Sequence, residues 1–184
     1  MSFRKLDERK IYRGPLISVA EGTFESPSGE PFVRDIVHHP GAVSVVPLLP
    51  GEREVVLVRQ YRAAVDRLLL EIPAGKRDVA DEPVEVTAHR ELEEEIGMRA
   101  GRLEPLAEFF NSPGFCDEHS FVFLARDLEA ATVSAQGVEE QHMTLERVAL
   151  ESVPELIASG ELIDAKSIIG LCLTRQRLAG EAQR

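Results

Sequence analysis

The sequence has few of the residues that would fix its class by themselves. It contains two cysteines, Cys116 and Cys172, and no tryptophan in 184 residues. Two thiols that are far apart in the chain favour a reducing cytoplasm, and we expect both to be packing residues. No apolar run reaches the roughly 18 residues that a membrane helix needs, so we expect no membrane partner. The charged first residues also predict that no secretory signal is present there.

An excess of basic charge is lacking as well. The chain has 21 Lys and Arg against 32 Asp and Glu, which gives a formal net charge of -11. Because binding to nucleic-acid phosphates needs a basic surface, we expect no nucleic-acid partner. The patterns GxGxxG and GxxxxGK[ST] do not occur, so neither a Rossmann domain nor a P-loop domain is indicated. The open question is whether the acids are clustered where solvation alone does not explain them.

Short apolar runs bounded by turns predict many strands and few helices. The strands are expected in a hairpin over residues 23–39 and at residues 42–49, 54–62, 68–75, 109–110, 119–128 and 141–148. Helices are expected at about residues 83–96, at 153–159 and from the N-cap Asp164 onward. Because strands and helices do not alternate regularly, the pattern favours an α+β fold with a mixed sheet.

The helix predicted at residues 83–96 has an apolar and an acidic face. Val84, Ala88, Leu92 and Ile96 recur every four residues and form a stripe that can pack on a core. Pro83 suits the first turn of this helix, and Gly97 suits the position just past its end.

Three acids, Glu91, Glu94 and Glu95, share the other face of this helix. Such neighbours repel one another and raise one another's pKa values unless a cation compensates them. Arg90, four residues before Glu94, is one compensator, and a divalent cation is a stronger one. Oxygen ligands favour Mg²⁺ or Mn²⁺ over zinc. The alternative interpretation is an ordinary solvated acidic face.

The acids belong to a longer motif, GKRDVADEPVEVTAHRELEEEIG, at residues 75–97. This motif resembles the signature of the Nudix hydrolase family at Gly75, Glu82, Arg90, Glu91, Leu92, Glu94, Glu95, Gly97 and Met98. It departs from the signature in having six residues between Gly75 and Glu82, where the family usually has five. We place the extra residue in the loop before Pro83, where it costs little, because Glu82 keeps the residue type and the spacing to Arg90. With Asp81 as the motif's acid, the extra residue would instead fall after it.

The resemblance implies a fold, a metal and a reaction. The fold would be a mixed-sheet α/β/α sandwich, and the reaction would be hydrolysis of a nucleoside diphosphate linked to another group. Mg²⁺, with Mn²⁺ as the alternative, would be held by Glu91, Glu94, Glu95 and the carbonyl of Ala74. Arg90 would orient the acids, and Gly75 and Glu82 would support them.

Several segments outside the motif resemble ADP-ribose pyrophosphatases, and the resemblance covers about residues 12–173. They are HHPGAVSVVPL, VRQYR, LLLEIPAGKRDV, NSPGFCDEHSFVFLA and GELIDAKSIIGL. The implied substrate is ADP-ribose, cleaved to AMP and ribose 5-phosphate. The alternatives are another nucleoside diphosphate derivative, such as a nucleotide sugar, NADH or a dinucleoside polyphosphate, and a non-catalytic ADP-ribose-sensing module. A sensing module is expected to have lost some of these acids and to carry a DNA-binding domain.

Four residues outside the motif are candidates for binding the substrate. Arg62 and Arg59 end a predicted strand, and a guanidinium suits phosphate recognition. Their alternative role is a salt bridge with Glu71 or Asp66. Pro113, sixteen residues after Gly97, and Phe115 would shape an adenine or ribose pocket. The alternative roles of this pair are a rigid turn and a core aromatic.

The resemblance also places a catalytic glutamate in VEEQHMT, residues 138–144. Glu140 is our choice and Glu139 is the alternative, because a carboxylate near the attacking water suits a general base. His142 is a further candidate. Residues 1–40 are expected to form an antiparallel β extension that builds a homodimer, and residues 41–184 the hydrolase domain.

Overall fold

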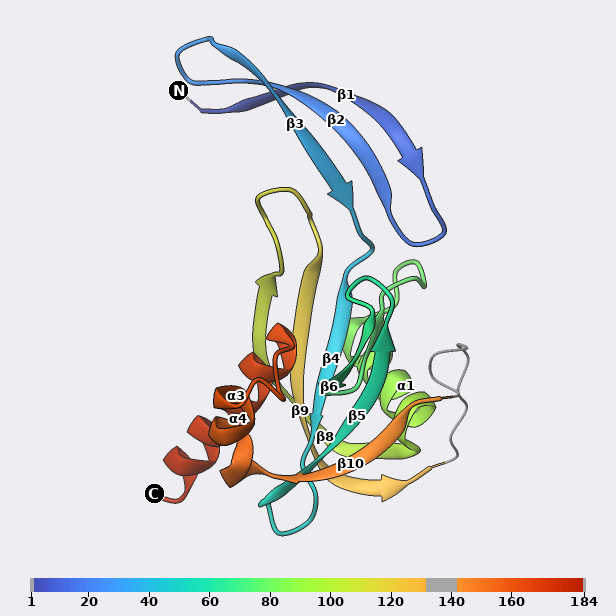
Figure 1. The fold of residues 1–184 in the computed structure, drawn as a ribbon, viewed down its shortest axis with the longest axis vertical. Helices are drawn as coiled ribbons and strands as arrows, with labels where there is room; N and C mark the ends of the chain where they lie inside the picture. The colour runs from blue at the N-terminus through green and yellow to red at the C-terminus, as the bar shows by residue number, and fades with distance from the viewer. Residues whose placement is uncertain (1, 132–141, 184) are drawn as a thin grey trace. The chain divides into compact units, whose positions relative to one another are not determined.

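The computed structural model describes residues 2–131 and 142–183 of the chain (Figure 1). Its strands are β1 Arg4–Arg13, β2 Ser18–Glu25, β3 Pro31–His38, β4 Ala42–Pro47, β5 Glu54–Arg62, β6 Arg67–Glu71, β7 Ala74–Lys76, β8 Met98–Phe110, β9 His119–Ala130 and β10 Thr144–Ala149. Its helices are α1 Val84–Ile96, the 3-10 helix η1 Leu150–Ser152, α3 Val153–Ala158 and α4 Ala165–Glu181. The chain forms two compact units, which are Met1–Gly41 with Phe109–Ser120, and Ala42–Glu108 with Phe121–Arg184.

The first unit is built on an antiparallel sheet of order β1-β2-β3. The predicted hairpin is confirmed as β2 and β3, joined by a turn in which Gly29 has a φ of 87°. The sequence did not indicate β1, because all but one of its residues are exposed and no apolar alternation marks it. Residues 109–120 also belong to this unit, since the Val37 amide donates to the Phe115 carbonyl at 2.7 Å.

A histidine at the end of β3 joins these segments. His38 Nδ1 lies 2.5 Å from Asp117 Oδ2, and His38 Nε2 lies 3.1 Å from Glu8 Oε1 on β1. The second oxygen of Asp117 accepts from the His39 amide at 2.8 Å. The hydrogen bond that His38 donates to Asp117, together with the charge of both carboxylates, outweighs partial burial and raises the pKa of His38.

We expect this contact to stabilise the first unit in a pH-dependent way. Because the pKa of His38 is raised above its unfolded value of 6.5, its contribution is complete below that pH and is lost as the pH rises through the folded-state pKa. Thermal unfolding of His38→Gln should therefore differ most from wild type between about pH 5 and 6.5, where the two carboxylates are also charged. Asp117→Asn is the control that keeps the shape and lowers the pKa of His38. A difference in melting temperature that is the same from pH 5 to 9 would contradict this expectation.

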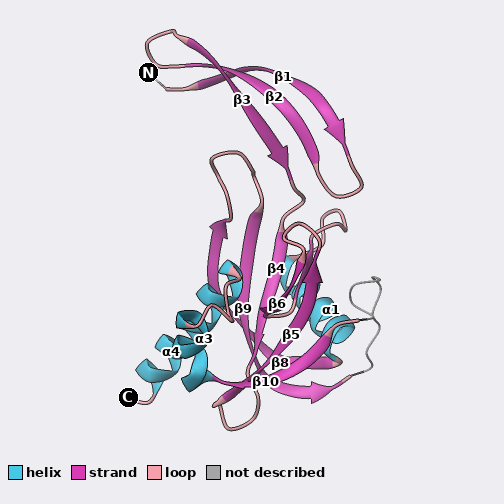
Figure 2. Cartoon of the chain, in the orientation of Figure 1, coloured by secondary structure: helices cyan, strands magenta, loops and turns pink. Residues whose placement is uncertain are grey.

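The second unit contains two sheets, of strand order β10-β5-β6 and β7-β4-β9-β8. Side chains on β4 alternate between two faces. Val43 and Val45 share a core cluster with Ala88 and Leu92 of α1. On the other face of β4, Val46 meets α4 at Gly170, where an added Cβ would lie 2.9 Å from a Val46 methyl carbon. The two helices therefore cover opposite faces of the sheet, as the ribbon and the cartoon show (Figure 1 and Figure 2).

Helices α1 and α4 confirm the features that the sequence predicted for them. In α1, Ala88, Leu92 and Ile96 are buried, and Val84 packs against the same cluster, so the predicted stripe is confirmed. Gly97 follows the helix in the left-handed conformation, with a φ of 63°. In α4, the Asp164 side chain accepts from the Ser167 amide, which confirms the predicted N-cap.

Three details of the sequence interpretation are corrected. The single strand expected at residues 68–75 is divided into β6 and β7, which belong to different sheets. Strand β8 begins at Met98, whereas only residues 109–110 were expected to be extended, because polar residues interrupt its apolar ones. Both cysteines are free thiols, but Cys116 is half-buried and Cys172 is exposed, so Cys172 is not a packing residue. In the part of the chain that the structure describes, no helix combines the length and apolar character that crossing a membrane requires.

Candidate active site

Two acids of α1 lie directly against strand β7. Glu95 is 5% exposed, and its Oε2 accepts from the Ala74 amide at 3.0 Å. The Glu91 carboxylate lies on the next residue, Gly75, so closely that an added Cβ would be 1.8 Å from Glu91 Cδ. Consecutive residues of β7 thus contact acids that are one helical turn apart, and only a glycine leaves room for the second contact.

Arg90 joins the acids to one another. Its Nη1 lies 2.8 Å from Glu91 Oε1 and 3.1 Å from Glu94 Oε2, and its Nη2 lies 3.3 Å from Glu82 Oε2. Burial disfavours the charged guanidinium, but the charge of Glu91 and the contacts with Glu82 and Glu94 outweigh burial and raise the pKa of Arg90. One cation therefore contacts three carboxylates, and a single nitrogen lies close to two of them.

Glu82 lies in the loop between β7 and α1 and contacts this cluster through Arg90. It accepts from the Thr87 hydroxyl at 2.7 Å as well as from Arg90, and these bonds lower the pKa of Glu82 despite some desolvation. Asp81 is exposed and has a φ of 59°, so the preceding loop takes up its extra residue in a left-handed turn. The arrangement favours Glu82 over Asp81 as the acid of the motif.

The chemistry of this cluster fits a hard divalent cation. Its donors are carboxylate oxygens, which Mg²⁺ and Mn²⁺ prefer, and the glycine cradle fixes one of them against the backbone. Among the described residues, however, no three acidic, histidine or cysteine side chains are grouped as a ready metal site. Arg90 contacts Glu91 and Glu94, and the Ala74 amide donates to Glu95.

Arg62 forms a forked ion pair near the same cluster. Its Nε and Nη2 donate to the two oxygens of Glu71 at 2.8 and 2.7 Å. Glu71 is 1% exposed, whereas the Arg62 side chain is 39% exposed. The bonds to Glu71 raise the pKa of Arg62, and the charges of Glu95 and Asp164 add to this effect. The alternative role of Arg62, a salt bridge with Glu71, is thus present, while its Nη1 has no hydrogen-bond partner among the described residues.

Arg59 is held elsewhere. Its Nε donates to Glu146 at 2.5 Å and its Nη2 to Glu161 at 2.5 Å, and the bond to Glu146 is the main cause of its raised pKa. Asp66, the other partner considered for the arginines, instead accepts from the Tyr61 hydroxyl at 2.8 Å. Arg59 is therefore occupied by two carboxylates.

The remaining candidates stand outside α1 and β7 in the sequence. Pro113 and Phe115 belong to the first unit, in a turn where Ser112 accepts from the Phe115 amide at 3.1 Å. Phe115 is 58% exposed, so its alternative role as a core aromatic is wrong. Glu139 and Glu140 lie outside the described residues, and His142 is exposed.

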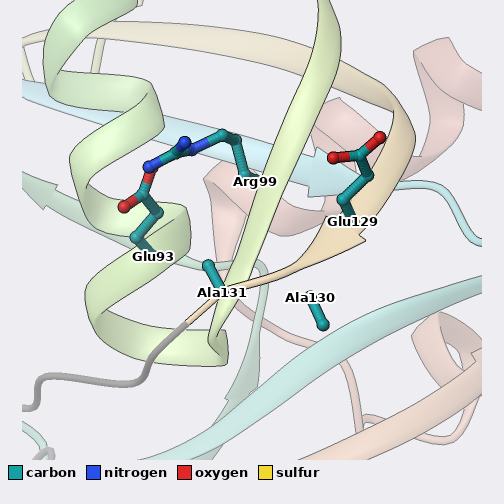
Figure 3. A pocket seen from close by; sticks show the side chains of 5 residues that line it. All are labelled: Glu93, Arg99, Glu129, Ala130 and Ala131. Carbon is teal, nitrogen blue, oxygen red and sulfur yellow. The ribbon is translucent and has the colours of Figure 1, made fainter.

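A pocket at the other side of α1 takes no part in this arrangement. Glu93, Arg99, Glu129, Ala130 and Ala131 line it, and Figure 3 shows the Glu93 and Arg99 side chains pointing toward each other. Their ion pair measures 2.7 Å and lowers the pKa of Glu93. None of Glu91, Glu94 and Glu95 lines this pocket.

The sequence interpretation missed the partners from α4. Lys166 contacts the buried Glu71, and the Ser167 hydroxyl accepts from the Ile72 amide at 2.8 Å. Both residues lie 95 positions from their partners, so no local pattern could have revealed them. The sequence signals in this region were the N-cap Asp164 and the segment GELIDAKSIIGL, which contains both residues without indicating their partners.

Comparison with known proteins identifies the family. The model of the NUDIX domain matches residues 38–168. ADP-ribose pyrophosphatase of Bacillus subtilis (strain 168) is 36% identical over 181 residues, which are 98% of this chain and 97% of that protein. Methanol dehydrogenase activator of Bacillus methanolicus is 33% identical over 168 residues, 91% and 90% of the two chains.

A solved structure described as an ADP compounds hydrolase has the same fold. Its TM-score is 0.86 at 23% identity, and the match covers 100% of this chain and 98% of the other. This likeness confirms the predicted mixed α/β fold. The match of residues 38–168 and the full-length relatives show that the chain belongs to the Nudix family of hydrolases.

Proposed function

We propose that the protein hydrolyses the diphosphate of ADP-ribose to AMP and ribose 5-phosphate and needs Mg²⁺, with Mn²⁺ as the alternative. The observation that carries this proposal is the convergence of Glu91 and Glu95 on consecutive residues of β7, with Arg90 between the acids. The full-length likeness to a protein named ADP-ribose pyrophosphatase supports the choice of substrate.

In this proposal the residues of α1 and β7 hold the cation. Glu91, Glu94, Glu95 and the Ala74 carbonyl would be its ligands, and Arg90 would keep the carboxylates oriented through its contacts with Glu91 and Glu94. A divalent cation in such a site offsets the charge of the diphosphate and lowers the pKa of the attacking water. Glu82 and Gly75 would support the cluster, the first by binding Arg90 and the second by leaving room for Glu91.

The substrate would be held by residues outside α1 and β7. Arg62 keeps its Nη1 for a phosphate oxygen, since only its Nε and Nη2 bind Glu71, whereas Arg59 must first leave Glu146 or Glu161. Pro113 and the exposed Phe115 would shape the adenine or ribose pocket. Water then adds to one phosphorus, the bridging P–O bond breaks, and a carboxylate accepts the proton.

The proposed proton acceptor is Glu140. We expect Glu140→Gln to lower kcat about tenfold to 10²-fold, because the amide cannot take the proton of the attacking water. Glu139→Gln is the matched control, since it removes the same charge one residue away. Steady-state rates of both variants decide between them, and a larger loss in Glu139→Gln would transfer the role to that residue.

The substrate is tested by comparing rates on a panel. ADP-ribose, a nucleotide sugar, NADH and a dinucleoside polyphosphate should each be incubated with the protein in Mg²⁺ and in Mn²⁺, and the products separated. We expect the highest kcat/KM for ADP-ribose and equal amounts of AMP and ribose 5-phosphate. A higher kcat/KM for another compound would replace ADP-ribose as the substrate.

We also propose that residues 1–40 build a homodimer. The first unit exposes large apolar side chains, among them Phe3 at 67%, Ile11 at 52% and Tyr12 at 55%. Apolar surface of this kind on a sheet is typical of an interaction face. Light scattering should give twice the mass of the 20.4 kDa chain, and the mass of one chain would overturn the proposal.

A further inference from the structure

Lys166 is a second cation on the buried carboxylate that binds Arg62. Its Nζ contacts Glu71 Oε2 and lies 2.9 Å from Asp164 Oδ2, and its side chain is 14% exposed. Glu71 is the last residue of β6 and precedes Ala74 by three residues. It is therefore close in sequence to β7, the strand that contacts Glu91 and Glu95. Glu71 thus has two cationic partners, one from β5 and one from α4.

The position of Lys166 is unfavourable for its own helix. It is the second residue of α4, and a cation in the first turn opposes the helix dipole. Asp164 already caps this end by accepting from the Ser167 amide at 3.0 Å and from the Ser167 hydroxyl at 2.5 Å. The stability of the helix therefore does not explain a lysine at position 166, whereas the contact of Lys166 with Glu71 explains it.

The two cations on Glu71 differ in what else they can reach. Lys166 is mostly buried and has both of its contacts within the cluster, whereas Arg62 is 39% exposed and keeps Nη1 free of partners among the described residues. Although burial opposes the charged form of Glu71, the two cations lower its pKa, so that Glu71 carries a full negative charge. With Arg62 as the only partner, that charge would cancel the charge of the guanidinium.

We propose that Lys166 is a positioning residue that offsets the negative charge of Glu71, so that Arg62 presents more of its positive charge to the diphosphate of the substrate. The proposal rests on the proposed function in one respect, which is that Arg62 contacts the diphosphate. It makes a prediction in terms of net charge alone. Removing Lys166 lowers the charge around Arg62 by one unit, and also removing the charge of Glu71 restores it.

Four variants test this by binding and by kinetics. Lys166→Met, Glu71→Gln, the double variant and Arg62→Ala should be compared with wild type for their affinity for ADP by calorimetry, and for kcat and KM with ADP-ribose. We expect Lys166→Met to weaken ADP binding and raise KM about tenfold with kcat within about twofold, because the loss is one of ligand binding. The double variant should return to within about threefold of wild type, and Lys166→Arg should keep full affinity.

The controls separate folding from charge. Circular dichroism and thermal unfolding show whether each variant is folded. Glu181→Gln breaks an ion pair of the same kind, between α4 and Arg126 at 2.8 Å, and should leave ADP affinity unchanged. If Lys166 only anchored α4, the double variant would bind ADP no better than Lys166→Met, and the proposal would be overturned. Unchanged affinity in Lys166→Met would overturn it as well.

The outcomes also distinguish this proposal from the proposed function. If ADP affinity follows the charge series but ADP-ribose is not cleaved, the substrate is wrong and the role of Lys166 stands. If ADP-ribose is cleaved and Arg62→Ala lowers ADP affinity while Lys166→Met does not, only the role of Lys166 is wrong. If Arg62→Ala leaves ADP affinity unchanged, Arg62 is not the diphosphate ligand and the role of Lys166 falls with it.

Discussion

Glu95→Gln is expected to lower kcat with ADP-ribose about 10³-fold while the protein stays folded, which corresponds to about 4 kcal/mol of lost transition-state stabilisation. Glu95 is buried and accepts from the Ala74 amide. Glutamine has nearly the same size and keeps an oxygen for that amide, so the helix should remain packed on β7. The variant loses the negative charge with which the proposed ligand attracts a hard cation.

The matched control for this prediction is Glu93→Gln on the same helix. Glu93 pairs with Arg99 in the pocket of Figure 3 and contacts neither Ala74 nor Arg90 in the described contacts. Glu93→Gln removes the same charge from α1 as Glu95→Gln does. We expect the kcat of Glu93→Gln to stay within about twofold of wild type, because an exposed ion pair contributes little to stability. The Mg²⁺ dependence of the rate and thermal unfolding should be measured for both variants. Near wild-type activity in Glu95→Gln would contradict the assignment of the site.

Gly75→Ala is expected to lower kcat/KM about 10²-fold and to destabilise the fold by about 1–3 kcal/mol. The reason is steric, since the new Cβ would lie 1.8 Å from Glu91 Cδ and 2.0 Å from Oε1. The carboxylate must move away, but Glu91 is 7% exposed and bound to Arg90, so it has little room. Its displacement would move one of the proposed metal ligands, and the Mg²⁺ concentration for half-maximal rate should rise.

Two further variants show whether the clash is the cause. Gly180→Ala adds the same methyl group on α4 where nothing lies within 4 Å, and we expect unchanged activity and unchanged or slightly raised stability. The double variant Gly75→Ala with Glu91→Asp shortens the displaced side chain, and should be more stable than Gly75→Ala alone. If Gly75→Ala had the activity and melting temperature of wild type, the Glu91 carboxylate would be able to adopt another position without loss.

The acidic face of α1 could be predicted from the sequence because a helix repeats locally. Spacings of three and four residues place Glu91, Glu94 and Glu95 on one face of a helix independently of the tertiary structure. Pro83 and Gly97 predicted where this helix begins and ends. Strand β5 was likewise predicted at residues 54–62 from its run of β-branched and apolar residues. That run is buried in the structure. Strand β1 was not, because an almost fully exposed strand has no apolar period.

The sequence by itself therefore determined the family, the helix that carries the acids and the residue types of the candidate site. Only the tertiary structure decided what those acids touch. That the Glu91 carboxylate rests on Gly75, that Arg62 shares Glu71 with Lys166, and that residues 109–120 join the N-terminal strands are long-range facts. Such contacts depend on how sheets and helices pack, and packing of residues up to 95 positions apart leaves no period in the chain that local spacing could reveal.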